Sequence, residues 1–130
     1  MVRALALVPD LLFGSRIQGT LRAAGFELAV VSDERLLREQ LAERGDAEGE
    51  VLIVDLTDPD VDGAELLRSL RDAGVLGPRR TLGFYAHVDV SARERAEAVG
   101  FDLVVPRSRL AREGADLVQA LADGPGASVD

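Results

Sequence analysis

Asp55 stands at a position in the sequence where a carboxylate could do chemistry. It directly follows Val51–Val54, an apolar run in which three of the four residues are β-branched, a composition typical of a strand buried on both faces. In an open α/β sheet, ligands and reacting groups gather at the carboxyl ends of the strands. An aspartate at such a place can bind a hard cation such as Mg²⁺ or attack a phosphoryl group. Asp55 is therefore a candidate site residue, and its role depends on the residues that the rest of the chain places around it.

Other residue types exclude several kinds of site. The chain has no Cys and a single His, His87, which excludes disulfides, thiolate metal sites and clusters of His ligands. We expect His87, alone in a polar loop, to be solvated. The pair Arg79-Arg80 could attract a phosphate, but in an acidic protein we expect it to form an exposed loop face. The sequence carries no glycine-rich nucleotide-binding motif and no G-x-S-x-G motif, so nucleotide-dependent and serine-hydrolase chemistry have no support.

Charge and length narrow the class of protein further. The 130 residues include 23 acidic and 15 basic side chains, and the net charge of −8 disfavours binding to nucleic acid or to an anionic membrane surface. No apolar run approaches the roughly 20 residues of a membrane span, and the N-terminus lacks the features of a signal peptide, so we expect a cytoplasmic protein. We expect one domain over residues 1–122 and a disordered tail over residues 123–130, which show no periodicity.

Five short apolar runs are predicted to be strands, and amphipathic segments separate them. The predicted strands are Ala4–Val8, Phe26–Val31, Val51–Val54, Thr81–Ala86 and Leu103–Val105. Such alternation calls for parallel βαβ units joined by right-handed crossovers, in a doubly wound domain of three layers. For five strands we expect the flavodoxin-like order 2-1-3-4-5. Its switch point lies between the first and third strands, so Asp10 and Asp55 are predicted to lie close together in one crevice.

The segments between the strands have the three- and four-residue apolar spacing of helices. The predicted N-caps are Asp10, Ser32 or Asp33, Asp62 and Ser91, and Glu65 and Glu94 give the last two the spacing of a capping box. The expected ends of the first four helices are Gly25, Gly45, Gly74 and Gly100. A last helix carries Leu110, Leu117, Val118 and Leu121, and Gly114 marks a point where it can bend.

The stretch from Asp55 to Gly63 carries a resemblance to a known family. It has the spacing D-x-x-x-P-x-x-D-G, completed by Pro59 and Asp62, after the third of five predicted strands. Over Arg3 to Ala122 the chain resembles a response-regulator receiver domain of two-component signalling. The resemblance implies that Asp55 accepts a phosphoryl group from a histidine kinase or phosphotransfer protein. It also implies Mg²⁺ bound by the Asp55 carboxylate and the main-chain carbonyl of Thr57, with no enzymatic activity beyond phosphoryl acceptance and self-dephosphorylation.

The acidic pair that the family places after the first strand is altered here. Counted back from Gly25, the pair falls on Val8 and Pro9, which cannot hold a cation through their side chains. Asp10 comes one residue late. Two interpretations stay open: Asp10 reaches the metal directly or through a water, or it only caps the helix that follows.

Two further family positions also differ. Where the family has a small hydroxyl residue at the end of the fourth strand, this chain has Tyr85, which we expect to pack across the crevice or against the fifth strand. Where the family has a Lys, this chain has Arg107, whose guanidinium can bind a carboxylate through two parallel hydrogen bonds. Arg107 is therefore expected either to hold Asp55 in a permanent ion pair or to point to solvent.

Three hypotheses follow for the function. The first is a stand-alone receiver-like protein phosphorylated on Asp55. The second, which the altered positions favour, is a binding or dimerisation module that works without phosphorylation, through the face formed by Ser91–Val99, the fifth strand and Leu110–Leu121. A flavodoxin-like or cobalamin-type small-molecule binder is the third, and it fits poorly. The loop after the first strand has Ser15 as its only hydroxyl residue, and His87 lies in the fourth βα unit.

Overall fold

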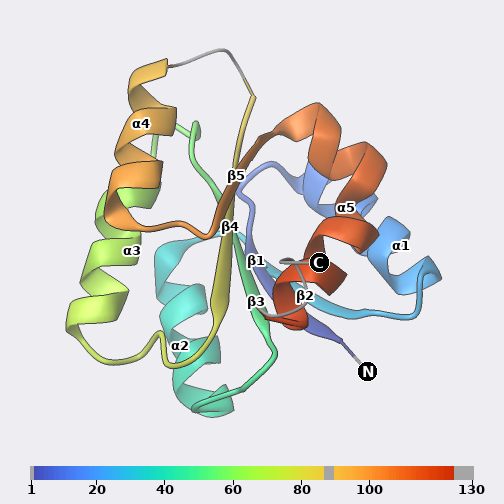
Figure 1. Cartoon of the computed structure of the whole chain (residues 1–130), viewed down its shortest axis with the longest axis horizontal. Coiled ribbons are helices and arrows are strands. Elements are labelled where there is room, and N and C mark those ends of the chain that lie inside the picture. The colour runs from blue at the N-terminus through green and yellow to red at the C-terminus, as the bar shows by residue number, and fades with distance from the viewer. Residues whose placement is uncertain (1, 87–89, 125–130) are drawn as a thin grey trace.

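The computed structural model describes residues 2–86 and 90–124 and shows them folded around a five-stranded parallel sheet (Figure 1). The strands are β1 (Arg3–Leu7), β2 (Glu27–Val31), β3 (Val51–Asp55), β4 (Arg80–Tyr85) and β5 (Leu103–Pro106). Their order is β2-β1-β3-β4-β5, and every neighbouring pair is parallel. The predicted flavodoxin-like α/β fold is confirmed, and β3 lies in the centre of the sheet.

Five helices cover the two faces of this sheet. They are α1 (Leu11–Ala23), α2 (Glu34–Arg44), α3 (Gly63–Asp72), α4 (Val90–Val99) and α5 (Arg107–Ala122). Figure 1 shows α1 and α5 on one face and α2, α3 and α4 on the other. None of the helices in the described ranges has the length and apolar character that crossing a bilayer requires.

The alternation of side chains along the strands explains this three-layer arrangement. In β1, Ala4 and Ala6 belong to the core under α1 and α5, whereas Leu5 and Leu7 belong to the core under α2 and α3. Successive residues of a strand point to opposite faces, so a strand that is apolar at every position must be covered on both sides. All five residues of β3 are buried, which places Asp55 at the end of a strand with no solvent-facing side.

Three of the predicted N-caps are confirmed by hydrogen bonds from backbone amides to aspartate oxygens. The amide of Phe13 donates to Asp10, that of Leu36 to Asp33, and that of Glu65 to Asp62, as the predicted cap positions require. The distances are 3.1, 2.8 and 3.1 Å. These caps fix where α1, α2 and α3 begin, and two of them flank the crevice at the carboxyl end of the sheet.

Several predicted boundaries were wrong in detail. Ser91 lies inside α4, which already includes Val90, so Ser91 is not its N-cap. The Glu65 side chain binds Arg68 at the surface, so the capping box is completed on the Asp62 side only. β5 extends through Pro106, and α5 begins at Arg107 without a side-chain cap. Residues 125–130 of the expected tail lie outside the described residues.

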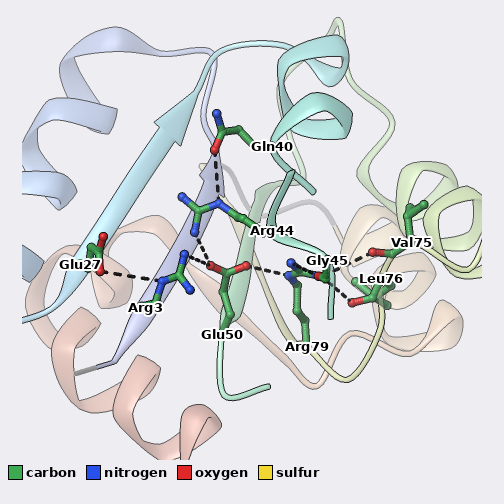
Figure 2. A network of polar contacts seen from close by, with 9 residues as sticks. All are labelled: Arg3, Glu27, Gln40, Arg44, Gly45, Glu50, Val75, Leu76 and Arg79. Carbon is green, nitrogen blue, oxygen red and sulfur yellow. Dashed lines mark hydrogen bonds and ion pairs between the residues drawn. The ribbon is translucent and has the colours of Figure 1, made fainter. Parts of the chain in front are cut away.

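A buried polar network lies at the amino end of β3 (Figure 2). Glu50, which precedes the strand, is 1% exposed and binds three arginines. Arg79 Nε donates to Glu50 Oε1 at 2.7 Å, Arg44 donates to Oε2, and Arg3 lies 3.9 Å from Oε2. The buried charge is therefore paired with guanidinium groups from three separate segments of the chain.

The expectation that Arg79 belongs to an exposed loop face was wrong. Its side chain is fully buried and donates to the main-chain oxygens of Gly45 at 2.7 Å and Leu76 at 3.1 Å, besides Glu50. Arg79 thereby joins the loop after α2 to the loop after α3. A buried arginine requires such complete pairing, because an isolated charge in the core is costly.

Candidate functional site at the carboxyl end of the sheet

Asp55 is the last residue of β3 and is 6% exposed. Its neighbour in the register of β4 is Phe84. The Asp55 Oδ1 atom accepts a hydrogen bond from the amide of Thr57 at 3.0 Å and a longer one from the Thr57 hydroxyl at 3.4 Å. The candidate nucleophile is therefore held by its own loop.

Burial raises the pKa of the Asp55 carboxyl above its ordinary value. The negative charge of Asp58 acts in the same direction, while the hydrogen bond from the Thr57 amide acts against both. The hydrogen bonds to this carboxylate come from its own loop, from the amide and hydroxyl of Thr57, and the backbone of Asp58 also lowers the pKa. The charged form of Asp55 thus lacks the cationic partners that Glu50 has at the other end of the same strand.

The Thr57 side chain also joins two loops. Its Oγ1 atom accepts a hydrogen bond from the amide of Ala86 at 2.9 Å, so the loop after β3 is tied to the residue that follows β4. The resemblance had assigned a role to the main-chain carbonyl of Thr57 and none to its hydroxyl. A hydroxyl residue two positions after an Asp is a signal for a local turn, but the bond to Ala86 spans 29 residues and has no local signature.

Asp10 and Arg107 form an ion pair beside this crevice. Arg107 Nη2 donates to Asp10 Oδ2 at 2.9 Å, while Asp10 Oδ1 caps α1 by accepting from the amide of Phe13. These two contacts hold the pKa of Asp10 below its ordinary value. The Arg107 guanidinium also lies over the ring of Phe13, with Cζ 4.1 Å from the ring centroid. Arg107 therefore pairs with Asp10, whereas we expected it to pair with Asp55 or to point to solvent. Asp10 caps α1, as one of its two interpretations predicted.

Tyr85 ends β4 and is half-buried beside Pro106 of β5. The two residues line a common hollow together with Arg107, so Tyr85 lies beside the fifth strand, as one of the two expectations had it. Its hydroxyl has no hydrogen bond to Asp55 among the described residues. His87 lies outside the described residues, and its expected solvation is untested.

Steric contacts explain why the last residue of the D-x-x-x-P-x-x-D-G motif, Gly63, is a glycine. A Cβ atom at Gly63 would lie 2.7 Å from Leu56 Cδ2 and 3.2 Å from Val54 Cγ1. Leu56 is equally close to Gly83 of β4, where a Cβ atom would lie 2.7 Å from its Cδ1 atom. Glycine at these two positions lets the first turn of α3 and strand β4 close around Leu56, which sets the path of the loop next to Asp55.

The described residues do not assemble a carboxylate set for Mg²⁺. Among them, no three His, Cys, Asp or Glu side chains are grouped so that they could hold a metal. Val8 is fully buried, and both oxygens of Asp10 are already bonded. A hard cation prefers several oxygen ligands, and Asp55 with the Thr57 carbonyl supplies two of them.

Solved structures of response regulators share this fold. A response regulator from Thermotoga maritima is 13% identical, with a TM-score of 0.78 over 95% of this chain and 99% of the other. The receiver domain of a Francisella response regulator is 18% identical, with a TM-score of 0.75 over 95% and 98%. A chemotaxis response regulator of Vibrio cholerae is 20% identical, with a TM-score of 0.71 over 91% and 98%. No family model matches the sequence, and no curated protein sequence matches it. At these identities the likeness shows the response-regulator receiver fold.

Proposed function

We propose that this chain is a receiver-fold signalling module of a two-component system that acts in the cytoplasm by binding a partner protein, without phosphorylation of Asp55. The observation that carries the proposal is the engagement of Asp10. Its two oxygens bond the Phe13 amide and Arg107, so the acid that follows the altered Val8-Pro9 pair in the sequence is already engaged.

The chemistry of phosphoryl transfer explains why this matters. Such reactions depend on positioning and on neutralising the charge of the transferring oxygens, for which receiver-like sites use a divalent cation. Among residues 2–86 and 90–124 the carboxylates do not assemble around Asp55, and Asp55 accepts hydrogen bonds from Thr57. The Ala86 amide, which could donate to a bound oxyanion, donates to the Thr57 hydroxyl instead.

The contact surface that we assign to the partner is the face of α4, β5 and α5. β5 is an edge strand of the sheet, and Ala96 is the buried residue of α4, so much of this helix surface is free of the core. A hollow of about 300 Å³ between β5 and α5 is lined by residues that include Leu103, Leu117 and Leu121. The partner is a histidine kinase, a phosphotransfer protein, another signalling protein or a second copy of this chain.

An NMR titration with Mg²⁺ and beryllofluoride, a phosphoryl mimic, tests the proposal. We expect the backbone amides of Asp55, Thr57 and Ala86 to keep their positions at millimolar Mg²⁺, with and without beryllofluoride. The matched control is Asp55→Asn, which keeps the shape of the side chain and removes the nucleophile. Changes in the unsubstituted protein that disappear in Asp55→Asn would overturn the proposal.

The second candidate function is acceptance of a phosphoryl group by Asp55, and the intact D-x-x-x-P-x-x-D-G motif favours it. Asp55 ends the central strand, Asp62 caps α3, and Gly63 permits the close approach of α3 to Leu56. Incubation with acetyl phosphate and Mg²⁺, followed by intact-protein mass measurement, separates the two candidates. A phosphoryl adduct that Asp55→Asn lacks would favour the acceptor, and an unmodified mass favours the binding module.

A further inference from the structure

A hollow of about 460 Å³ opens at the carboxyl end of the sheet, between residues of α1, the ends of β4 and β5, and the first turns of α5. Its walls include Phe13, Arg16, Tyr85, Pro106, Arg107 and Ser108. We call it the α1–α5 hollow. Asp55 is not among its lining residues, although Tyr85, Ala86 and Arg107 of the carboxyl-end site are. Its volume lies within the range of about 300–1,000 Å³ that is usual for small-molecule sites.

The charge of the α1–α5 hollow is opposite to that of the whole protein. Two guanidinium groups, of Arg16 and Arg107, line it, and no acidic side chain is found among the described residues of its lining. The net charge of the chain is −8. Asp10 bonds one edge of Arg107 and offsets part of this local charge. The positive charge that remains in the hollow matches a ligand with a single negative charge.

Arg107 is held in place before any ligand arrives. Asp10 binds its Nη2 atom at 2.9 Å, and the Phe13 ring packs against its guanidinium with Cζ 4.1 Å from the centroid. Within the described chain, its Nε and Nη1 groups make no hydrogen bond. An arginine fixed on two sides loses little further freedom on binding, which favours recognition of a carboxylate by its planar donors.

The remaining walls suit an apolar body next to that negative charge. Phe13, Pro106 and Ala111 supply apolar surface, and the hydroxyls of Tyr85 and Ser108 supply further donors. Ligand sites in proteins are usually built in this way, from apolar walls with a few polar groups. The geometry points to a binding site in the α1–α5 hollow for a small organic anion, a carboxylate on a flat apolar body.

The site is tested with 2-naphthoate as the probe and its uncharged amide, 2-naphthamide, as the chemical control. We expect millimolar 2-naphthoate to move the amide signals of Phe13, Arg107 and Ser108 in NMR spectra of the full chain. The uncharged amide is expected to bind at least about tenfold more weakly, because it lacks the negative charge and the second acceptor oxygen that a carboxylate offers to a guanidinium.

The matched variants are Arg16→Gln, inside the hollow, and Arg22→Gln, an exposed arginine of the same helix that does not line it. We expect Arg16→Gln to weaken 2-naphthoate binding about tenfold and Arg22→Gln to leave it unchanged. Equal binding of acid and amide, equal loss in both variants, or an absence of shifts at Arg107 and Ser108 would each overturn the inference. A Mg²⁺-dependent change at Asp55 bears on the proposed function alone.

Discussion

The central strand β3 has a buried carboxylate at each end, and the two have opposite surroundings. Glu50, before the strand, is 1% exposed, and Asp55, its last residue, is 6% exposed. Glu50 binds Arg3, Arg44 and Arg79 (Figure 2). Asp55 receives hydrogen bonds from Thr57 and no ion pair among the described residues.

We infer from this difference that Glu50 stabilises the fold, whereas Asp55 is available for binding. A buried charge is compatible with a stable fold only while its partners are present. Removing a partner leaves an uncompensated buried ion, which destabilises the folded protein. A buried carboxyl with a raised pKa and few partners is typical of a functional position. The amino end of the sheet is therefore the structural end, and the carboxyl end is where binding is expected.

The largest effect is expected at the structural end. Glu50→Gln removes the charge that three arginines share and leaves the buried Arg79 guanidinium without its anion. We expect a loss of about 3–5 kcal/mol in the free energy of unfolding, measured by urea denaturation. The control is Glu48→Gln, an exposed neighbour, which should change stability by less than about 0.5 kcal/mol. Similar losses in both variants would contradict the assignment of Glu50 as the buried partner.

Asp55→Asn is expected to have a smaller effect of the opposite sign. Because burial raises the pKa of Asp55, its charged form is unfavourable in the folded protein, and the uncharged amide removes that cost. We expect the free energy of unfolding at neutral pH to rise, by less than the loss that Glu50→Gln causes. A destabilised variant would show that the Asp55 charge is favourably held, as Glu50 is.

The pH dependence of this gain follows from the sign of the shift. A carboxyl with a raised folded-state pKa contributes stability below its unfolded value, near 3.8, and loses it as the pH rises through the folded value. The advantage of Asp55→Asn should therefore grow as the pH rises from 3.8 and then level off. Urea denaturation at a series of pH values measures it, and a constant difference would contradict the shift.

Asp10→Asn should give the smallest change of the series, because Asn can still cap α1 and the pair with Arg107 is partly exposed. We expect a slightly lower melting temperature at neutral pH. The pKa of Asp10 is lowered, so the contribution of its charge is present above about 3.8 and is lost as the pH falls through the folded value. The two proteins should converge in acid, and a gap that widened there would contradict this assignment.

The sequence predicted what depends on local pattern. Apolar runs located the five strands, and Asp10, Asp33 and Asp62 were recognised as caps because their partners lie three residues away. Contacts between distant charged residues were missed. Arg79 meets Glu50 across 29 residues, and Arg107 meets Asp10 across 97.

Such pairings depend on the register of the sheet and on how the loops at its two ends meet. Spacing alone therefore placed Arg79 at the surface and left Arg107 without its true partner. The same limit applies to the site: the position of Asp55 at a strand end was predictable, but the hydrogen bond that joins Thr57 to Ala86 was not.

The most direct test of the account is a carbon-detected NMR titration of the Asp55 side-chain carboxyl, with and without millimolar Mg²⁺. We expect a pKa above the ordinary 3.8 that Mg²⁺ leaves unchanged, because burial raises it and the carboxylates of the described residues do not assemble a metal site. A pKa that falls when Mg²⁺ is added would contradict the central claim, since it would show the cation bound to Asp55 and the crevice ready for phosphoryl transfer.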